Sequence, residues 1–293
     1  MFHGPICAIV TPFHKGNVDT DAYARLIEFQ LKGGVTGLVS CGTTGEASTL
    51  SDDEQIATIA FAVQRVRGRV PVIAGTGSNE TRHAIALTRR AREAGADAAL
   101  LVTPYYNKTT QAGLVEHFTA VAESVPGFPI ILYNVPGRTG LNLLPATAAK
   151  LSLVKNIVAV KEASGNIAQS VEILVRTGGK MTVLSGEDPL YLPLLAVGAK
   201  GIISVTANVA PKLMAELYRG FTAGDMAKAR RLHEKLWPVH DAMFCEGNPI
   251  PVKAALAMMG LIREEYRLPL VKIGKDNRKR LAAVLRAAGL LEG

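Results

Sequence analysis

The chain has 293 residues and a net charge of +8, and it is 48% hydrophobic, 20% charged and 5% aromatic. This composition excludes a disordered or collagen-like chain, and no apolar run approaches the roughly 18 residues that a membrane-spanning helix needs. The length accommodates a βα barrel of about 250 residues together with some additional structure. We therefore expect a soluble globular protein.

The N-terminus and the cysteines predict a cytoplasmic protein. The first apolar run begins at Ile6, which leaves no room for a removable signal peptide. Cys7, Cys41 and Cys245 lie far apart and form no CxxC pair. We therefore expect neither a disulfide framework nor a zinc site.

Short apolar runs recur along the chain with a mean spacing of about 28 residues. Most are continuous rather than alternating, which is typical of strands that are buried on both faces of a parallel sheet. The eight runs cover residues 6–10, 37–40, 70–74, 98–102, 130–135, 157–160, 182–184 and 202–205.

Helical patterns fill the gaps between these runs, and they cover residues 22–32, 52–67, 81–94, 113–124, 167–176 and 212–221. Ser51 precedes one helical pattern as an N-cap, and Gly34, Gly95 and Gly198 follow others. Eight strand–helix alternations predict a closed (β/α)8 TIM barrel over residues 1–224. A doubly wound open sheet is the alternative.

After Gly224 the strand signal stops, and helical patterns cover residues 226–243, 252–259 and 277–288. We expect residues 225–293 to form C-terminal helices appended to the barrel, because no flexible linker precedes them. This segment holds 13 basic and 8 acidic residues. Its basic cluster at residues 275–280 has no interleaved aromatic side chains that would stack on bases, so we expect a solvated helix start capped by Asp276 or Asn277. The alternative to an enzyme is a nucleic-acid-binding or regulatory protein built on the barrel, and only the net charge of the chain favours it.

Reactive groups of such a barrel lie at the C-terminal ends of the strands. Lys161 follows the apolar run 157–160, and side-chain alternation directs either Lys161 or Glu162 into the barrel. A lysine inside would lose hydration, which lowers its pKa and frees the amine as a nucleophile. The alternative is a structural ion pair. Tyr133 ends the preceding run and can either exchange a proton beside Lys161 or simply pack in the core.

Other strand ends carry polar groups as well. Residues 42–46 form a Gly-Thr-Thr-Gly-Glu turn ahead of a helix, where free N–H groups can hold an anion and Thr43 can relay a proton. Arg138, on the loop 136–140, suits capture of a substrate carboxylate, although a surface ion pair is the alternative. Tyr105 and Tyr106 end a further run.

Motifs of other enzyme classes are missing from the sequence. The six histidines form no HxH or HExxH pattern, and no P-loop, GxSxG elbow or dinucleotide fingerprint occurs. No carboxylate cluster resembles a magnesium site. We therefore expect a lysine-based enzyme that uses neither a metal nor a cofactor.

These segments together resemble the dihydrodipicolinate synthase family of pyruvate-dependent class I aldolases, in the superfamily of N-acetylneuraminate lyase. The resemblance covers nearly the whole chain, through residues 8–13, 42–46, 72–77, 102–108, 132–140, 160–163 and 203–208. N-acetylneuraminate lyases and keto-sugar-acid aldolases share the lysine and the tyrosine. Arg138 and the Thr-Thr turn favour the synthase over these alternatives.

The resemblance implies a role for each matched residue. Lys161 would form a Schiff base with pyruvate, while Tyr133, Thr43 and Tyr106 would relay protons, Tyr106 by reaching into a neighbouring subunit of a homotetramer, a dimer of dimers. Thr44 would help Thr43 to hold the pyruvate carboxylate. The remaining implied contacts are Arg138 with the carboxylate of L-aspartate 4-semialdehyde, and Gly186 and the Ile203 carbonyl beside the lysine. The product would be 4-hydroxy-tetrahydrodipicolinate, on the route to diaminopimelate and lysine.

The resemblance also implies a possible site for regulation, because lysine inhibits many members at an interface between subunits. Ser48, Asn79 and Tyr105 match that site. Two positions that usually hold imidazoles are occupied here by Asp52 and Gln55. A position that usually holds a glutamate is occupied by His83. A lost carboxylate weakens capture of the ammonium groups of lysine. We therefore expect weak or absent feedback by lysine.

Overall fold

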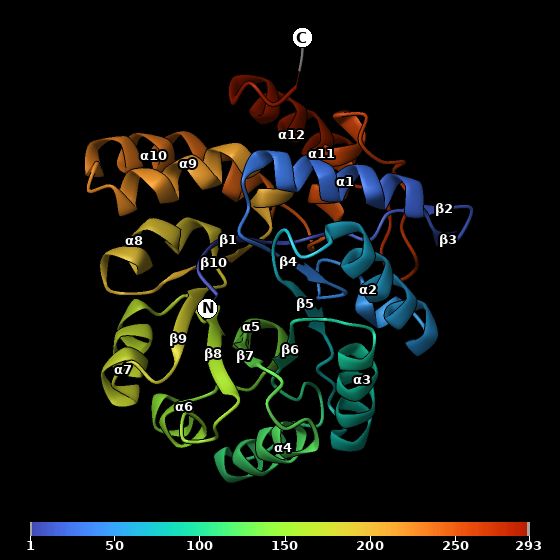
Figure 1. The fold of residues 1–293 in the computed structure, drawn as a ribbon. Coiled ribbons are helices and arrows are strands. Elements are labelled where there is room, and N and C mark those ends of the chain that lie inside the picture. Colours follow the sequence, from blue (N-terminus) through green and yellow to red (C-terminus); the bar gives the residue numbers. More distant parts are fainter. Residues whose placement is uncertain (1, 292–293) are drawn as a thin grey trace.

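The computed structural model describes residues 2–291. Eight parallel strands close into a barrel, and helices surround it (Figure 1). The strands are β1 (Gly4–Ala8), β4 (Gly37–Ser40), β5 (Val72–Gly75), β6 (Ala98–Val102), β7 (Ile130–Asn134), β8 (Ile157–Glu162), β9 (Thr182–Ser185) and β10 (Gly201–Ser204). The predicted (β/α)8 barrel is confirmed. The open-sheet alternative is wrong, because β1 pairs with both β4 and β10 and closes the sheet.

Each predicted apolar run overlaps one barrel strand, and the boundaries differ by at most two residues. The last strand shows why they differ. It begins at Gly201, one residue before the predicted run, and position 201 requires a glycine because a Cβ there would lie 2.3 Å from the carbonyl oxygen of Gly4 on β1. A glycine that allows close strand approach carries no apolar signal in the sequence.

The helices around the barrel are α1 (Thr20–Gly33), α2 (Asp52–Val66), α3 (Thr81–Glu93), α4 (Gln111–Ser124), α5 (Pro136–Thr139), α6 (Pro145–Leu151), α7 (Ile167–Thr177), α8 (Tyr191–Ala196) and α9 (Pro211–Thr222). Ser51 caps α2 as predicted, because its hydroxyl accepts from the Glu54 N–H and the Glu54 carboxylate accepts from the Ser51 N–H. Gly34 ends α1 with a φ of 85°. The sequence prediction missed α5, α6 and α8, which are too short for a clear helical period. It also missed a hairpin of β2 (Phe13–His14) and β3 (Asn17–Val18).

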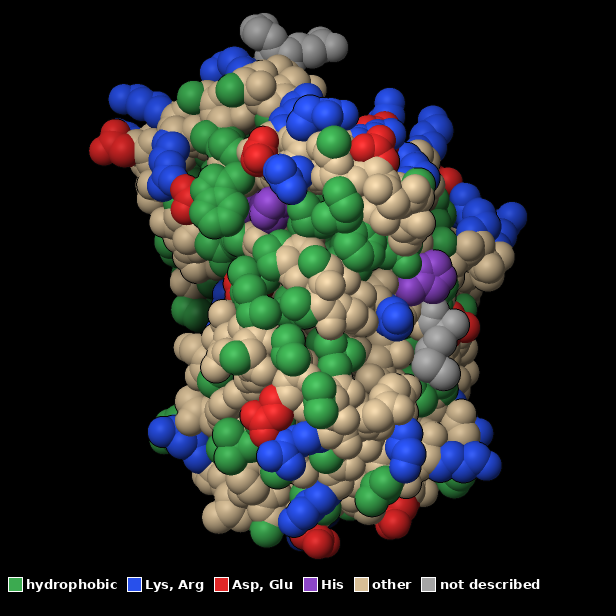
Figure 2. Space-filling model, turned by 90° about the vertical axis from the view of Figure 1, so that its left-hand side faces the viewer, with side chains coloured by type: hydrophobic (Ala, Val, Ile, Leu, Met, Phe, Trp, Pro, Cys, Tyr) green, Lys and Arg blue, Asp and Glu red, His purple; other side chains and the backbone are tan. Residues whose placement is uncertain are grey.

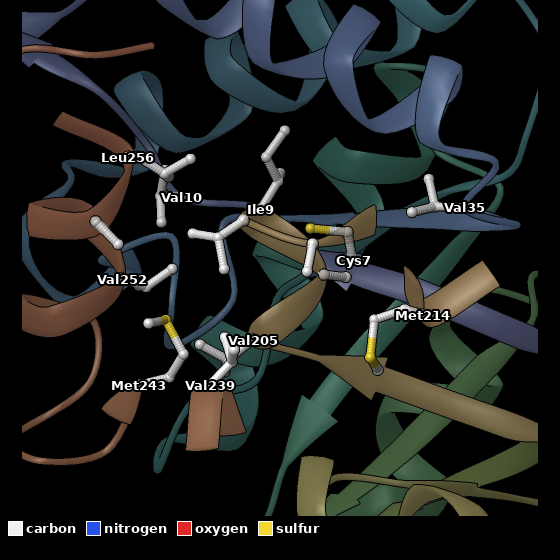
Figure 3. Packing of buried hydrophobic residues seen from close by; sticks show 14 of the residues in the cluster. Cys7, Ile9, Val10, Val35, Val205, Met214, Val239, Met243, Val252 and Leu256 are labelled. Carbon is white, nitrogen blue, oxygen red and sulfur yellow. The ribbon is translucent and has the colours of Figure 1, made fainter. Parts of the chain in front are cut away.

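The C-terminal helices are α10 (Met226–Ala242), α11 (Ile250–Met258) and α12 (Lys275–Ala287). They share a buried cluster with the barrel, in which Cys7 and Val205 pack with Val239 of α10 and Val252 of α11 (Figure 3). The fold with appended helices is thus confirmed, whereas the exact division at Gly224 stays a prediction. None of the helices within residues 2–291 is long and apolar enough to cross a membrane.

The predicted cap of α12 is wrong. Gly274, not Asp276 or Asn277, is the N-cap, and α12 begins at Lys275. The Glu246 carboxylate accepts from both the Gly274 N–H and the Asn277 side-chain amide, at 2.9 Å each. A carboxylate 28 positions away in the sequence therefore fixes this helix start, which no local capping pattern reveals.

Candidate active site

Lys161 lies inside the barrel near the end of β8. Its side chain is 5% exposed, and Nζ lies 4.1 Å from the ring centroid of Tyr133, its direct partner on β7. Glu162 is engaged instead with polar groups toward α7, where it accepts from Gln169 over 3.1 Å and from the Ser164 N–H over 2.7 Å. Lys161 forms no ion pair within residues 2–291, so the structural-ion-pair alternative finds no support there.

Burial controls the protonation of Lys161. Loss of hydration lowers its pKa to about 8, while the nearby Asp188 and Glu187 carboxylates oppose this change and Arg138 adds to it. About one amine in ten is then neutral at pH 7, compared with well under one in a thousand for an exposed lysine. A buried, partly neutral amine is the form of lysine that attacks a ketone.

Tyr133 packs its ring in the barrel interior and keeps its hydroxyl available for hydrogen bonding. Burial raises its pKa to about 12; Arg138 and hydrogen bonding with the Thr43 side chain lower the pKa, and Glu187 raises it. Tyr133 and Thr43 line one cavity of about 320 Å³. The phenol therefore holds its proton at neutral pH and can exchange it with a group in this cavity. The Tyr133 ring also packs in the buried core of the barrel, as the core-packing alternative predicted. The proton-exchange role of its hydroxyl stays a prediction.

The turn after β4 presents two unpaired backbone donors. The N–H groups of Thr43 and Thr44 bond to no group in the part of the chain that the structure describes. Cys41 and Glu46 on either side have φ values of 55° and 56°, which bring the turn back on itself. Adjacent free N–H groups in such a turn form a concave site that attracts an anion. The Thr44 hydroxyl accepts a hydrogen bond from Asn248 Nδ2 over 3.0 Å.

Gly186 provides the space that Lys161 occupies. A Cβ at position 186 would lie 3.1 Å from Cε of Lys161 and 2.6 Å from the Ala163 Cβ. Its N–H donates to the Glu162 carbonyl over 2.7 Å, which holds the backbone close to β8. Ile203 on β10 belongs to the same buried barrel interior as Tyr133. Gly186 thus lies against Lys161, and Ile203 lies in the barrel interior.

Arg138 lies on α5, directly after the strand that carries Tyr133. Its guanidinium donates to the Asn248 backbone carbonyl over 3.4 Å. The described residues place no carboxylate in an ion pair with Arg138, so the surface-ion-pair alternative finds no support. Its charge lowers the pKa of both Lys161 and Tyr133, as expected for a cation that faces the same site.

Tyr106 is the one predicted catalytic residue that its own chain leaves outside. It is 91% exposed and has a φ of 70°, and it is absent from the lining of the 320 Å³ cavity. Tyr105, by contrast, is 39% exposed and lines that cavity. Asn79 donates to the Tyr105 carbonyl over 3.2 Å and thereby holds the loop that carries Tyr105 and Tyr106.

Two of the three residues of the predicted regulatory site, Ser48 and Tyr105, share this cavity with Thr43 and Tyr133, whereas Asn79 does not line it. Asp52, Gln55 and His83 also line the cavity. His83 Nε2 lies 3.0 Å from an Asp52 carboxylate oxygen, and Gln55 donates to the Gly75 carbonyl over 2.6 Å. The carboxylate at Asp52 is therefore engaged by an imidazole rather than free for a ligand ammonium group.

Sequence reasoning missed Asp188. Its side chain is 1% exposed and accepts from the Val205 and Thr206 N–H groups over 3.0 Å each, and from the Ser204 hydroxyl. It thereby fixes the backbone after β10 while its charge acts on Lys161. The available signal was the acidic pair Glu187-Asp188, which follows the apolar run 182–184 after Ser185 and Gly186. Residues 2–291 gather no group of three or more His, Cys, Asp or Glu side chains that could hold a metal ion, and the absence of a cofactor stays a prediction.

The model of the dihydrodipicolinate synthetase family matches residues 1–288. The chain belongs to this family. It is 56% identical over 292 residues to 4-hydroxy-tetrahydrodipicolinate synthase of Thermodesulfovibrio yellowstonii, with both chains covered completely. The crystal structure of dihydrodipicolinate synthase from Aquifex aeolicus is similar over the whole of both chains, with a TM-score of 0.97 and 47% identity. A structure described as the first monomeric dihydrodipicolinate synthase variant gives a TM-score of 0.97 at 44% identity, covering 99% of this chain and 98% of its own. The predicted family is therefore confirmed.

Proposed function

We propose that the protein condenses pyruvate with L-aspartate 4-semialdehyde to give 4-hydroxy-tetrahydrodipicolinate, a step toward diaminopimelate and lysine. The observation that carries this proposal is the buried Lys161 amine, whose pKa is lowered to about 8, beside the Tyr133 ring. The name of the relative with 56% identity supports the same activity. No metal or cofactor is required by this chemistry.

The reaction begins when the neutral amine of Lys161 attacks the pyruvate ketone and water leaves, which forms a Schiff base. Loss of a methyl proton then gives an enamine, and its carbon adds to the aldehyde of the second substrate. The amine of that substrate attacks the imine carbon, closes the ring and releases Lys161. In this sequence Tyr133 and Thr43 exchange the protons, because a phenol linked to a hydroxyl moves protons without leaving a net charge in the pocket.

Each substrate carboxylate has a binding group of its own. The free N–H groups at Thr43 and Thr44, with the Thr44 hydroxyl, suit the pyruvate carboxylate. Arg138 suits the carboxylate of the semialdehyde, since a guanidinium binds a carboxylate through two parallel hydrogen bonds. Gly186 leaves room beside the imine, and we assign the Ile203 carbonyl to the same end of the pocket.

We propose a homotetramer in which Tyr106 completes the proton relay of a neighbouring subunit. An exposed tyrosine in a left-handed conformation supports this, because its own chain gives it almost no contacts. Figure 2 shows hydrophobic side chains gathered on the face formed by α7, α8 and α10, where Val175, Val197 and Trp237 are exposed. Analytical ultracentrifugation tests this proposal, and a monomer that is fully active would contradict it.

We further propose that lysine inhibits weakly or not at all, because the carboxylate of Asp52 already contacts His83. The cytoplasmic location also stays a proposal, and the three free cysteines support it. Both ideas are independent of the assignment of the reaction.

Incubation with pyruvate and borohydride, followed by digestion and mass spectrometry, tests the proposed function. We expect the reduced pyruvate adduct on Lys161, together with consumption of aspartate semialdehyde. No adduct on Lys161 would refute the Schiff-base mechanism. Faster turnover of N-acetylneuraminate or a keto-sugar acid would show that the substrate assignment is wrong.

A further inference from the structure

Two side chains of the C-terminal segment contact the turn that carries Thr43 and Thr44. Asn248 precedes α11 and is 7% exposed, and Lys253 lies in α11 and is fully buried. Asn248 Nδ2 donates to Thr44 Oγ1 over 3.0 Å, and Lys253 Nζ donates to a carboxylate oxygen of Glu46. These contacts span 204 and 207 positions of sequence. We call Asn248 and Lys253 the C-terminal latch.

The ion pair between Lys253 and Glu46 is completely buried, since both side chains are 0% exposed. The ammonium group also lies 4.3 Å from the ring centroid of Phe13 and 5.2 Å from that of Tyr266. Within residues 2–291, the second carboxylate oxygen of Glu46 has no hydrogen-bond partner. Taking two charges out of water offsets most of their attraction, so such a pair contributes little net stability. The pair connects Glu46 of the turn to Lys253 of α11, which favours a geometric role.

Glu46 closes the turn through its backbone. Its φ of 56° is a left-handed conformation that a residue with a side chain rarely adopts. Its N–H donates to the Thr43 carbonyl over 3.1 Å, and its carbonyl accepts from the Thr49 N–H over 3.0 Å. Because Lys253 holds the other end of the residue, the ion pair fixes the turn in the shape that exposes the N–H groups of Thr43 and Thr44.

Asn248 controls the direction of the Thr44 hydroxyl. Because Asn248 donates to the hydroxyl oxygen, the hydroxyl hydrogen remains free for a second acceptor, which a substrate carboxylate provides. The backbone carbonyl of Asn248 accepts from Arg138 over 3.4 Å. Asn248 therefore contacts a group of each of the two carboxylate sites.

We propose that the C-terminal latch positions both carboxylate-binding groups of the barrel: Lys253 fixes the turn through Glu46, and Asn248 orients the Thr44 hydroxyl and the Arg138 guanidinium. This inference rests on the proposed function and deepens it. Asn248 and Lys253 act through other residues, so they are positioning residues rather than catalytic ones. The segment that follows the barrel thus completes its active site.

The test measures the pyruvate concentration that gives half-maximal borohydride trapping of Lys161, which needs no second substrate. We expect Asn248→Ala to raise this concentration about tenfold, the effect of one lost oriented hydrogen bond to a charged group. Asn248→Asp should raise it further, because the new carboxylate takes the Thr44 hydrogen and repels pyruvate. Glu46→Gln with Lys253→Met removes both buried charges together, and we expect a similar rise without an unpaired buried charge.

Lys253→Arg keeps the charge and serves as the conservative variant. We expect it to keep more of the affinity for pyruvate than the double variant does. Arg280→Met removes an exposed ion pair with Asp241 in the same segment, and it should trap pyruvate like the wild type. Trapping at the wild-type concentration by both Asn248→Ala and the double variant would overturn the proposal. The proposal would also be overturned if these variants lowered the unfolding temperature without changing the pyruvate concentration that gives half-maximal trapping. Absence of trapping in the wild type would instead refute the proposed function itself.

Discussion

The Lys161 amine lies over the ring of Tyr133, with 4.1 Å between Nζ and the ring centroid. The two residues are direct partners across β7 and β8, so the barrel register itself sets this contact. A charged amine gains attraction from the ring face, which offsets part of the hydration it loses on burial. Burial nevertheless shifts the equilibrium toward the neutral amine relative to an exposed lysine, as the lowered pKa of Lys161 shows.

Lys161 should cost the protein stability. Its pKa is about 8 in the folded protein and 10.5 when exposed, so between these values the unfolded chain binds more protons and stability rises with pH. Below pH 8 the full penalty applies, about 3 kcal/mol. We expect Lys161→Met to raise the free energy of unfolding by about this amount at pH 7, and the gain to shrink as pH approaches 10.5. Urea unfolding at several pH values measures it. An equal effect at all pH values would show that protonation is not the cause.

Tyr133→Phe should lower kcat by about 10²–10⁴-fold, because it removes the hydroxyl that exchanges protons while keeping the buried ring. Steady-state kinetics with both substrates measure this change, and near-ultraviolet circular dichroism checks the fold. Tyr218→Phe is a matched control, since that hydroxyl lies near His3, away from Lys161. A comparable loss in the control, or none in Tyr133→Phe, would contradict the proton-relay role.

Gly186→Ala should displace the Lys161 side chain, because the new Cβ would lie 3.1 Å from its Cε and Cγ. We expect borohydride trapping to slow by about tenfold or more, since a displacement of about 1 Å at a reacting group can cost 10²-fold. Gly220→Ala in α9 is the control, where the nearest atoms lie at 3.4 Å or beyond and a side chain fits. Normal trapping by Gly186→Ala would mean that the lysine moves freely aside.

Arg138→Ala should raise the KM for aspartate semialdehyde by about tenfold or more, because a bidentate charged contact is lost. Trapping of pyruvate in the absence of the aldehyde should change much less. The two assays use the same preparation, so a folding defect would affect both. Equal losses in both assays would contradict the assignment of Arg138 to the second substrate.

Sub-millimolar lysine should leave the activity unchanged, because His83 occupies the Asp52 carboxylate at 3.0 Å. His83→Glu replaces the imidazole with a second carboxylate and should introduce inhibition by lysine, since opposite charges attract across such a site. His83→Gln removes the imidazole without adding charge and is the control. Strong inhibition of the wild type, measured as a lysine titration of the initial rate, would contradict the proposal.

The sequence by itself determined the barrel and the main site residues. Eight continuous apolar runs require strands buried on both faces, and this local property does not depend on which strands become neighbours. The position of Lys161 and Tyr133 at the ends of two such runs then placed both at one end of the barrel. Local patterns carried this information, because strand ends and turns are set by nearby residues.

Tertiary structure alone decided the rest. Alternation allowed either Lys161 or Glu162 inside the barrel, and the polar partners of Glu162 on and before α7 settled the choice. The contact between Asn248 and Thr44 spans 204 positions, and the cap of α12 comes from Glu246. Such contacts form only when distant segments pack together, so no local pattern predicts them. For the same reason the lowered pKa of Lys161 belongs to the folded barrel, which removes the water around it.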